Sequence, residues 1–105
     1  MPLHKRSKEF EENIMSQEQR DLMDEVLNIK STRILSLCRY GFYHQSVSLK
    51  HQAKRSDCER NDMANMLIES KVFKYIAFRC ATRLRTLRRH QKRRESKKNN
   101  IGDDV

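Results

Sequence analysis

The chain has 105 residues, of which 36% are hydrophobic, and it carries a formal net charge of +9. This length supplies one modest hydrophobic core and no second domain, so we expect marginal stability or help from a partner. The longest uncharged run, residues 40–49, has about half the apolar length that a bilayer span requires, which excludes a transmembrane helix. Charged residues at the N-terminus precede no apolar stretch, so we expect a nuclear or cytoplasmic protein that is not secreted.

Residues that break helices are rare in this sequence. Pro2, Gly41 and Gly102 are the complete set of prolines and glycines. A β-protein of this length needs several turn residues and many β-branched residues, whereas helices tolerate long stretches without either. The sequence therefore predicts an all-α fold: a small helical hairpin or three-helix domain with a long C-terminal basic amphipathic helix.

Three segments are predicted along the chain. Residues 1–15 are expected to be a flexible N-terminal leader, residues 16–94 a single helical domain, and residues 95–105 a disordered C-terminal tail. We expect the two principal helices of the domain to pack against each other as a hairpin, because each carries a long apolar stripe that must be buried.

The first principal helix is predicted over residues 17–39. Ser16 followed by Gln19 has the spacing of a capping box, and acidic residues follow near the expected N-terminus, where negative charge is favoured. Gly41 is expected to end the helix. The apolar positions that recur on its predicted buried face are Met23, Leu27, Ile34, Leu37 and Cys38.

The segment from residue 42 to residue 57, predicted to be irregular or a short helix, contains two members of a possible zinc set, and the other two flank it. Cys38, His44, His51 and Cys58 supply ligand types for tetrahedral zinc, although their spacing is not a familiar one. Ligands seven residues apart on one helix lie about 10 Å apart along its axis, so zinc binding requires a non-helical segment. We expect no metal and no other cofactor, with the cysteines reduced and the histidines exposed or in contact with phosphate.

The last helix is predicted over about residues 60–94, preceded by a second possible capping box at Ser56 and Glu59. Gaps of three and four residues alternate along it, as in a seam of four heptads, interrupted by the polar Ser70. Its first half carries further apolar residues and should be buried, whereas its second half should project. The residues predicted to pack the helix or to bind a partner are Met63, Met66, Phe73, Ala77, Cys80, Leu84 and Leu87.

Positive charge is concentrated in residues 71–100, which contain twelve Lys or Arg residues and one acidic residue, Glu95. Charges nearly cancel in the preceding residues. A cluster of this kind creates a directed field for phosphates, and guanidinium groups pair well with phosphate oxygens. The predicted phosphate contacts are Arg79, Arg83, Arg85, Arg88, Arg89, Lys92, Arg93 and Arg94.

These features favour a small nucleic-acid-binding protein with an accessory or regulatory role, of the general make-up that viral accessory proteins have. RNA, structured or double-stranded, is preferred over DNA as the partner, because an arginine-rich helix can recognise RNA by shape and phosphate spacing. Tyr75 or Phe78 would stack on bases if exposed. No leucine-zipper, zinc-finger or RNA-recognition signature is found, and no catalytic motif, so neither catalysis nor a small-molecule substrate is expected.

Three alternatives remain. The heptad face could dock a protein partner or a second copy of the chain, with the basic run acting as a nuclear localisation signal. The basic amphipathic helix could instead bind a calmodulin-like groove or an anionic membrane surface, although no membrane role is expected. The C-terminal carboxylate at Val105 could enter a peptide-binding groove.

Overall fold

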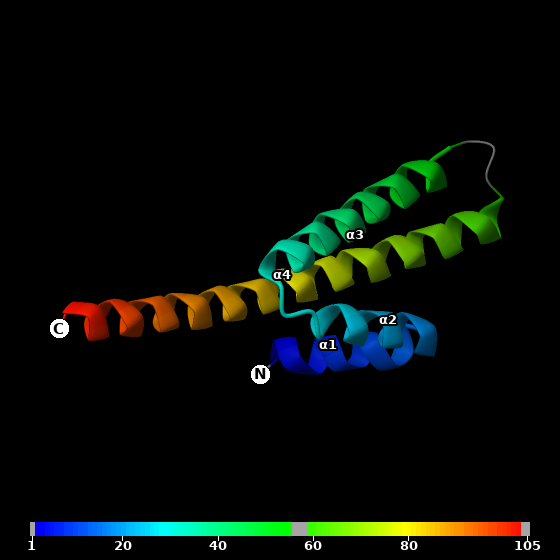
Figure 1. Ribbon diagram of the computed structural model, residues 1–105. Helices are drawn as coiled ribbons and strands as arrows, with labels where there is room; N and C mark the ends of the chain where they lie inside the picture. The colour runs from blue at the N-terminus through cyan, green and yellow to red at the C-terminus, as the bar shows by residue number, and fades with distance from the viewer. Residues whose placement is uncertain (1, 56–58, 104–105) are drawn as a thin grey trace.

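The computed structural model describes residues 2–55 and 59–103, and it describes the side chains of residues 8–55 and 59–94. The described residues form helices without strands, so the predicted all-α fold is confirmed. In Figure 1, α4 lies between α3 on one side and α1 with α2 on the other, and its C-terminal part extends beyond them. The molecule measures 69 × 27 × 22 Å. The helices are α1 (Pro2–Asn13), α2 (Gln17–Leu27), α3 (Thr32–Ala53) and α4 (Arg60–Asp103).

The predicted start of the first principal helix is confirmed, because Ser16 and Gln19 form a complete capping box at the N-terminus of α2. The Ser16 N–H donates to Gln19 Oε1 at 2.8 Å, and the Gln19 N–H donates to Ser16 Oγ at 3.2 Å. Two of the N–H groups that an α-helix leaves without partners at its start are thereby satisfied.

The predicted end of that helix is wrong, because α2 stops at Leu27 and a new helix begins at Thr32. Asn28 is the C-cap of α2, and Ser31 is the N-cap of α3, where its Oγ accepts a hydrogen bond from the Ile34 N–H at 3.3 Å. Asn and Ser compete with helical hydrogen bonding in helix interiors but favour helix ends, which accounts for the break.

The prediction that Gly41 ends a helix is wrong, because Gly41 lies inside α3. This helix continues to Ala53 and occupies most of the segment predicted to be irregular or a short helix. A Cβ atom placed on Gly41 would meet no other atom within 4 Å. The glycine is therefore not required for a close helix contact, and packing of α3 against α4 outweighs its weak helix propensity.

We expect Gly41→Ala to raise the free energy of unfolding by about 0.5–1 kcal/mol, because alanine favours the helix and the added methyl group enters open space. Urea denaturation followed by circular dichroism would measure the change. A destabilised variant would contradict the placement of Gly41 in the interior of α3.

The N-terminal segment, predicted to be a flexible leader over residues 1–15, contains the helix α1, which packs against α4. The rings of Phe10 and Tyr75 are 4.7 Å apart between centroids, and the Tyr75 hydroxyl donates to Glu11 Oε2 at 2.8 Å. Met15, just after α1, is buried. These contacts join residues more than 60 positions apart in the sequence, so local pattern could not reveal them.

The C-terminal tail also differs from expectation, since the backbone of α4 is helical through Asp103 instead of being disordered from residue 95. Lys, Arg, Gln and Glu, which are common in this segment, all have good helix propensity, and no strong breaker precedes Gly102. Residues 104–105, and with them the suggested carboxylate motif at Val105, lie outside the described residues.

The core lies along α4, on the surfaces that face α2 and α3. Among the heptad residues, Ala77, Cys80 and Leu84 are buried. Met63, Met66, Phe73 and Leu87 are half-buried. The largest fully buried side chains are Met23, Leu35, Ile76, Leu84, Val72 and Cys80.

The seam packs against α3 within the same chain. The rings of Phe42 and Phe73 stack with centroids 5.9 Å apart. Ser70, which interrupts the seam, finds its hydrogen-bond partners on α3. The Ser70 hydroxyl lies 3.2 Å from Ser46 Oγ and donates to the Ser46 carbonyl at 2.7 Å. Both serines are buried, so this pairing avoids the cost of unsatisfied polar groups in the helix interface.

The predicted buried face of residues 32–39 is wrong at two of its three positions, although Cys38 does pack against the core cluster. Leu35, absent from the predicted stripe, is fully buried, whereas Ile34 and Leu37 are 51% and 65% exposed. The break at Asn28–Ser31 changes the angular relation between residues before and after it, so a stripe extrapolated from α2 selects the wrong face of α3.

Candidate functional site

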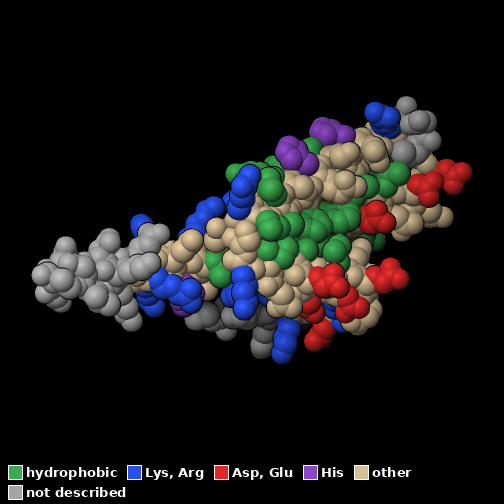
Figure 2. All heavy atoms as spheres, in the orientation of Figure 1, with side chains coloured by type: hydrophobic (Ala, Val, Ile, Leu, Met, Phe, Trp, Pro, Cys, Tyr) green, Lys and Arg blue, Asp and Glu red, His purple; other side chains and the backbone are tan. Residues whose placement is uncertain are grey.

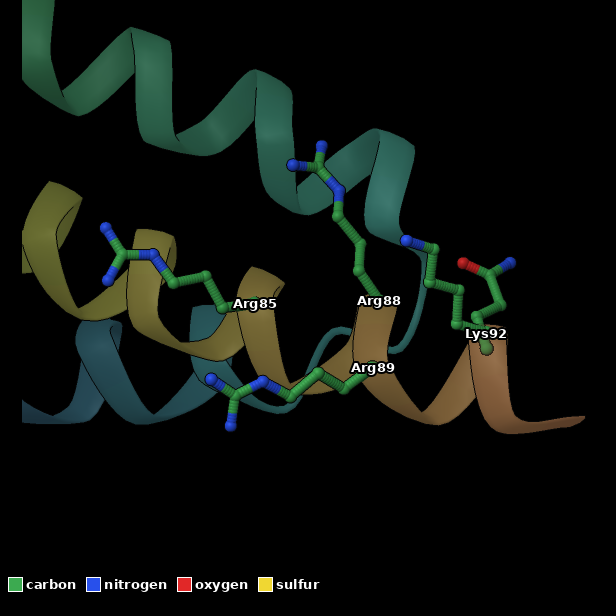
Figure 3. Close-up of a pocket in the computed structure, with 5 residues that line it drawn as sticks. Arg85, Arg88, Arg89 and Lys92 are labelled. Atoms are coloured by element: carbon green, nitrogen blue, oxygen red, sulfur yellow. The ribbon is translucent and has the colours of Figure 1, made fainter.

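The basic half of α4, which we define as Arg79–Arg94, presents most of the predicted phosphate contacts to solvent. Arg79 is half-buried, and the other seven are exposed: Arg83, Arg85, Arg88, Arg89, Lys92, Arg93 and Arg94. Four of these side chains, together with Gln91, line an open hollow of about 520 Å³. Figure 3 shows Arg85, Arg88, Arg89 and Lys92 extending from the helix in different directions. A single helix thus displays cations around much of its circumference.

These cations are not neutralised by neighbouring acidic groups. Within the described side chains, none of the eight predicted contacts makes an ion pair or a hydrogen bond through its charged group. Figure 2 shows the Asp and Glu side chains on the half of the molecule away from the C-terminal end of α4, whereas the visible Lys and Arg side chains lie mostly, but not all, toward that end. The separation leaves the basic half of α4 available to an external anion.

The connection between α2 and α3 adds cations that the sequence analysis missed. Lys30 and Arg33, both exposed, line one wall of a cleft of about 510 Å³, and Arg83, His90 and Arg94 of α4 line the opposite wall. We name this space the α3–α4 cleft. Lys30 and Arg33 are isolated positive charges in the sequence, and only the break at Asn28–Ser31 places them beside α4.

Phe78, one of the two aromatic side chains suggested for base stacking, is 60% exposed. Tyr75 is half-buried on the side of α4 that faces α1, where its ring contacts Phe10 and its hydroxyl donates a hydrogen bond to Glu11. Positions four and seven residues apart share a face of a helix, so Lys74 and Arg85 lie on the same side of α4 as Phe78. The structure therefore leaves Phe78 exposed beside basic residues, whereas the ring and hydroxyl of Tyr75 contact α1.

No family model, curated protein or solved structure matches this chain. The functional argument therefore rests on the geometry and charge of the residues described above.

The possible zinc set is not assembled by the described residues. Cys38, His44 and His51 all lie in α3, and Cys58 lies outside the described residues. His44 and His51 are exposed and seven residues apart in a continuous helix, so they are about 10 Å apart along its axis. Among the described side chains, no three His, Cys, Asp or Glu residues are placed to hold a metal ion.

Cys80 is a core residue and is unsuited to thiolate chemistry. Burial, with a smaller effect from the neighbouring Cys38, raises the pKa of its thiol to about 11, although Arg39 acts in the opposite direction. The thiol is consequently protonated at neutral pH, and a protonated thiol is neither a good nucleophile nor a metal ligand. Cys38, which is half-buried, is also a free cysteine.

In the part of the chain that the structure describes, none of the helices is both long enough and apolar enough to cross a membrane. Although α4 is long enough, charged side chains are frequent along it.

Proposed function

We propose that this protein binds nucleic acid, with RNA favoured over DNA, through the basic half of α4, and that it acts without catalysis as an accessory or regulatory factor. The observation that carries the proposal is the set of seven exposed cations on one projecting helix, none of them paired with a described acidic side chain. The proposed location is nuclear or cytoplasmic, and a nuclear localisation signal in the basic run belongs to the alternative described below.

Binding would be driven mainly by phosphate contacts. Each Lys or Arg that neutralises a phosphate releases condensed counterions, so affinity falls steeply as the salt concentration rises. The guanidinium groups of residues such as Arg85 and Arg88 can also form two parallel hydrogen bonds to one phosphate. Because cations surround much of the helix, the nucleic acid is expected to be recognised by shape and phosphate spacing more than by its bases.

The main alternative is a protein-interaction subunit whose heptad face binds a partner. In this structure α3 already covers that face, through contacts such as those between Phe42 and Phe73. A protein partner would instead have to use apolar side chains that remain exposed, such as Ile34 and Leu37 on α3. This surface favours a second candidate function, an adaptor, but it contains none of the predicted partner residues.

The proposal is tested by fluorescence anisotropy of the nuclease-treated protein with labelled double-stranded RNA, single-stranded RNA and double-stranded DNA. Each ligand is titrated at low salt and at about 150 mM salt. Submicromolar binding at the higher salt with preference for one RNA form would support the proposal. An equal collapse of affinity for all three ligands would contradict it and would favour the adaptor.

Phe78→Ala separates binding of single strands from binding of duplexes. If unstacked bases contact Phe78, the variant should bind single-stranded RNA about 5-fold to 100-fold more weakly, because base–aromatic stacking contributes about 1–3 kcal/mol per base. Duplex RNA affinity should be unchanged. The control is Leu37→Ala, which also removes an exposed apolar side chain, but from α3 instead of α4. Unchanged single-strand affinity in Phe78→Ala would exclude stacking at this position.

A further inference from the structure

The α3–α4 cleft is a two-sided cationic site, in contrast to the open surface of α4. Four permanently charged side chains line it, together with His90: Lys30 from the α2–α3 connection, Arg33 from the start of α3, and Arg83 and Arg94 from α4. Among the side chains that the structure describes, none that lines the cleft is acidic. Opposed cations on two walls can contact several oxygens of one bound phosphate, whereas a single helix face approaches a phosphate from one side.

Both walls of the cleft are held by the fold. On one wall, Ser31 caps α3 through its bond to the Ile34 N–H, and Leu35, one residue further, is fully buried. On the other wall, Leu84 is buried and Leu87, which lines the cleft, packs against the core cluster. The backbone positions that carry Lys30, Arg33 and Arg83 are consequently fixed relative to one another before any ligand binds, which lowers the entropic cost of binding.

We infer that the α3–α4 cleft binds a phosphodiester of the RNA backbone, with Lys30 and Arg33 completing a site that α4 alone does not provide. This inference rests on the proposed function and adds a specific phosphate position to it. A consequence is that RNA bound along α4 must also lie beside the start of α3. Arg88 and Lys92, which line the adjoining open surface, would contact other phosphates of the same strand.

The test compares two double variants of the full chain that each remove two exposed cations. Lys30→Gln with Arg33→Gln removes one wall of the cleft, and Lys54→Gln with Arg55→Gln removes equal charge at the far end of α3. The cleft variant should bind labelled RNA about tenfold or more weakly than the control variant, and the slope of log affinity against log salt should fall by about one, because the two side chains contact one phosphate. Thermal melts establish that both variants are folded.

Equal affinities of the two double variants would overturn the cleft site, while RNA binding by the wild-type protein would still support the proposed function. A separate titration of the isotope-labelled wild-type protein with inorganic pyrophosphate, followed by amide NMR shifts, tests the cleft independently of RNA. Shifts at Thr32, Arg33, His90 and Gln91 are expected. Absence of shifts at these residues would also contradict the inference. Shifts in a protein that binds no RNA would show a phosphate site in the cleft but would contradict both the proposed function and RNA as the occupant of the cleft.

Discussion

Replacing Arg85, Arg88, Arg89 and Lys92 together by Gln is expected to reduce the affinity for RNA by at least 100-fold at low salt. All four side chains are exposed, so the substitutions remove charge without opening the core. Each is expected to contact one phosphate, and loss of four contacts should lower the slope of log affinity against log salt by about four. Anisotropy titrations at several salt concentrations measure both quantities.

The matched control removes four cations from the other end of the molecule. Lys50, Lys54, Arg55 and Arg60 are exposed around the connection between α3 and α4, which Figure 1 places far from the C-terminal end of α4. Their replacement by Gln produces the same net charge as the first variant. If binding depends on total charge alone, the two variants will bind RNA equally weakly, and the basic half of α4 will have no special role.

The comparison is informative because the long-range field and the local contacts make different contributions. A change in net charge affects the rate of encounter with any polyanion and is screened within about 10 Å at 0.1 M salt. Loss of a guanidinium that is paired with a phosphate removes a charge-assisted hydrogen bond as well, and this contribution persists at higher salt. A difference between the variants that remains at about 150 mM salt therefore reports contacts.

Features that depend on a few adjacent residues could be predicted from the sequence. The capping box of Ser16 and Gln19, the long last helix and the exposure of its basic second half all follow from local propensity and periodicity. The same reasoning located seven exposed cations of the candidate interface correctly on α4. That these cations bind RNA stays a prediction.

Features that depend on contacts between distant segments could not be predicted. Phe10 and Glu11 lie in α1 and contact the ring and the hydroxyl of Tyr75 in α4. No local sequence pattern near residue 10 indicates such a partner. Lys30 and Arg33 have no neighbouring positive cluster in the sequence, and they join the basic surface because α3 begins beside α4. The second wall of the α3–α4 cleft is therefore a tertiary feature.

The prediction of one unbroken helix in place of α2 and α3 is the error with the largest consequences. A helix extended through residue 39 predicts that Leu37 faces the core, whereas restarting the helix after Ser31 turns Leu35 inward. The heptad periodicity of α4 was unaffected by this error, because its seam is internally consistent over four repeats. Whether Leu35 or Leu37 is buried thus distinguishes the two arrangements experimentally.

Leu35→Ala is expected to lower the free energy of unfolding by about 2–5 kcal/mol, because the substitution leaves a cavity among fully buried neighbours of the core cluster such as Ile76. Leu37→Ala, the same change two residues along the same helix, should alter the free energy of unfolding by less than about 0.5 kcal/mol, since the Leu37 side chain is 65% exposed. Urea denaturation of both variants gives the comparison.

The result bears on the proposed function as well as on the fold. A protein of this size has a stability of about 5–15 kcal/mol, so Leu35→Ala removes a large share of it. Leu35 lies two residues from Arg33, and loosening the start of α3 should separate the walls of the α3–α4 cleft before the whole chain unfolds. RNA affinity in Leu35→Ala should then fall under conditions where α4 is still helical. A larger loss of stability in Leu37→Ala than in Leu35→Ala would instead support the uninterrupted helix and remove the structural basis of the cleft.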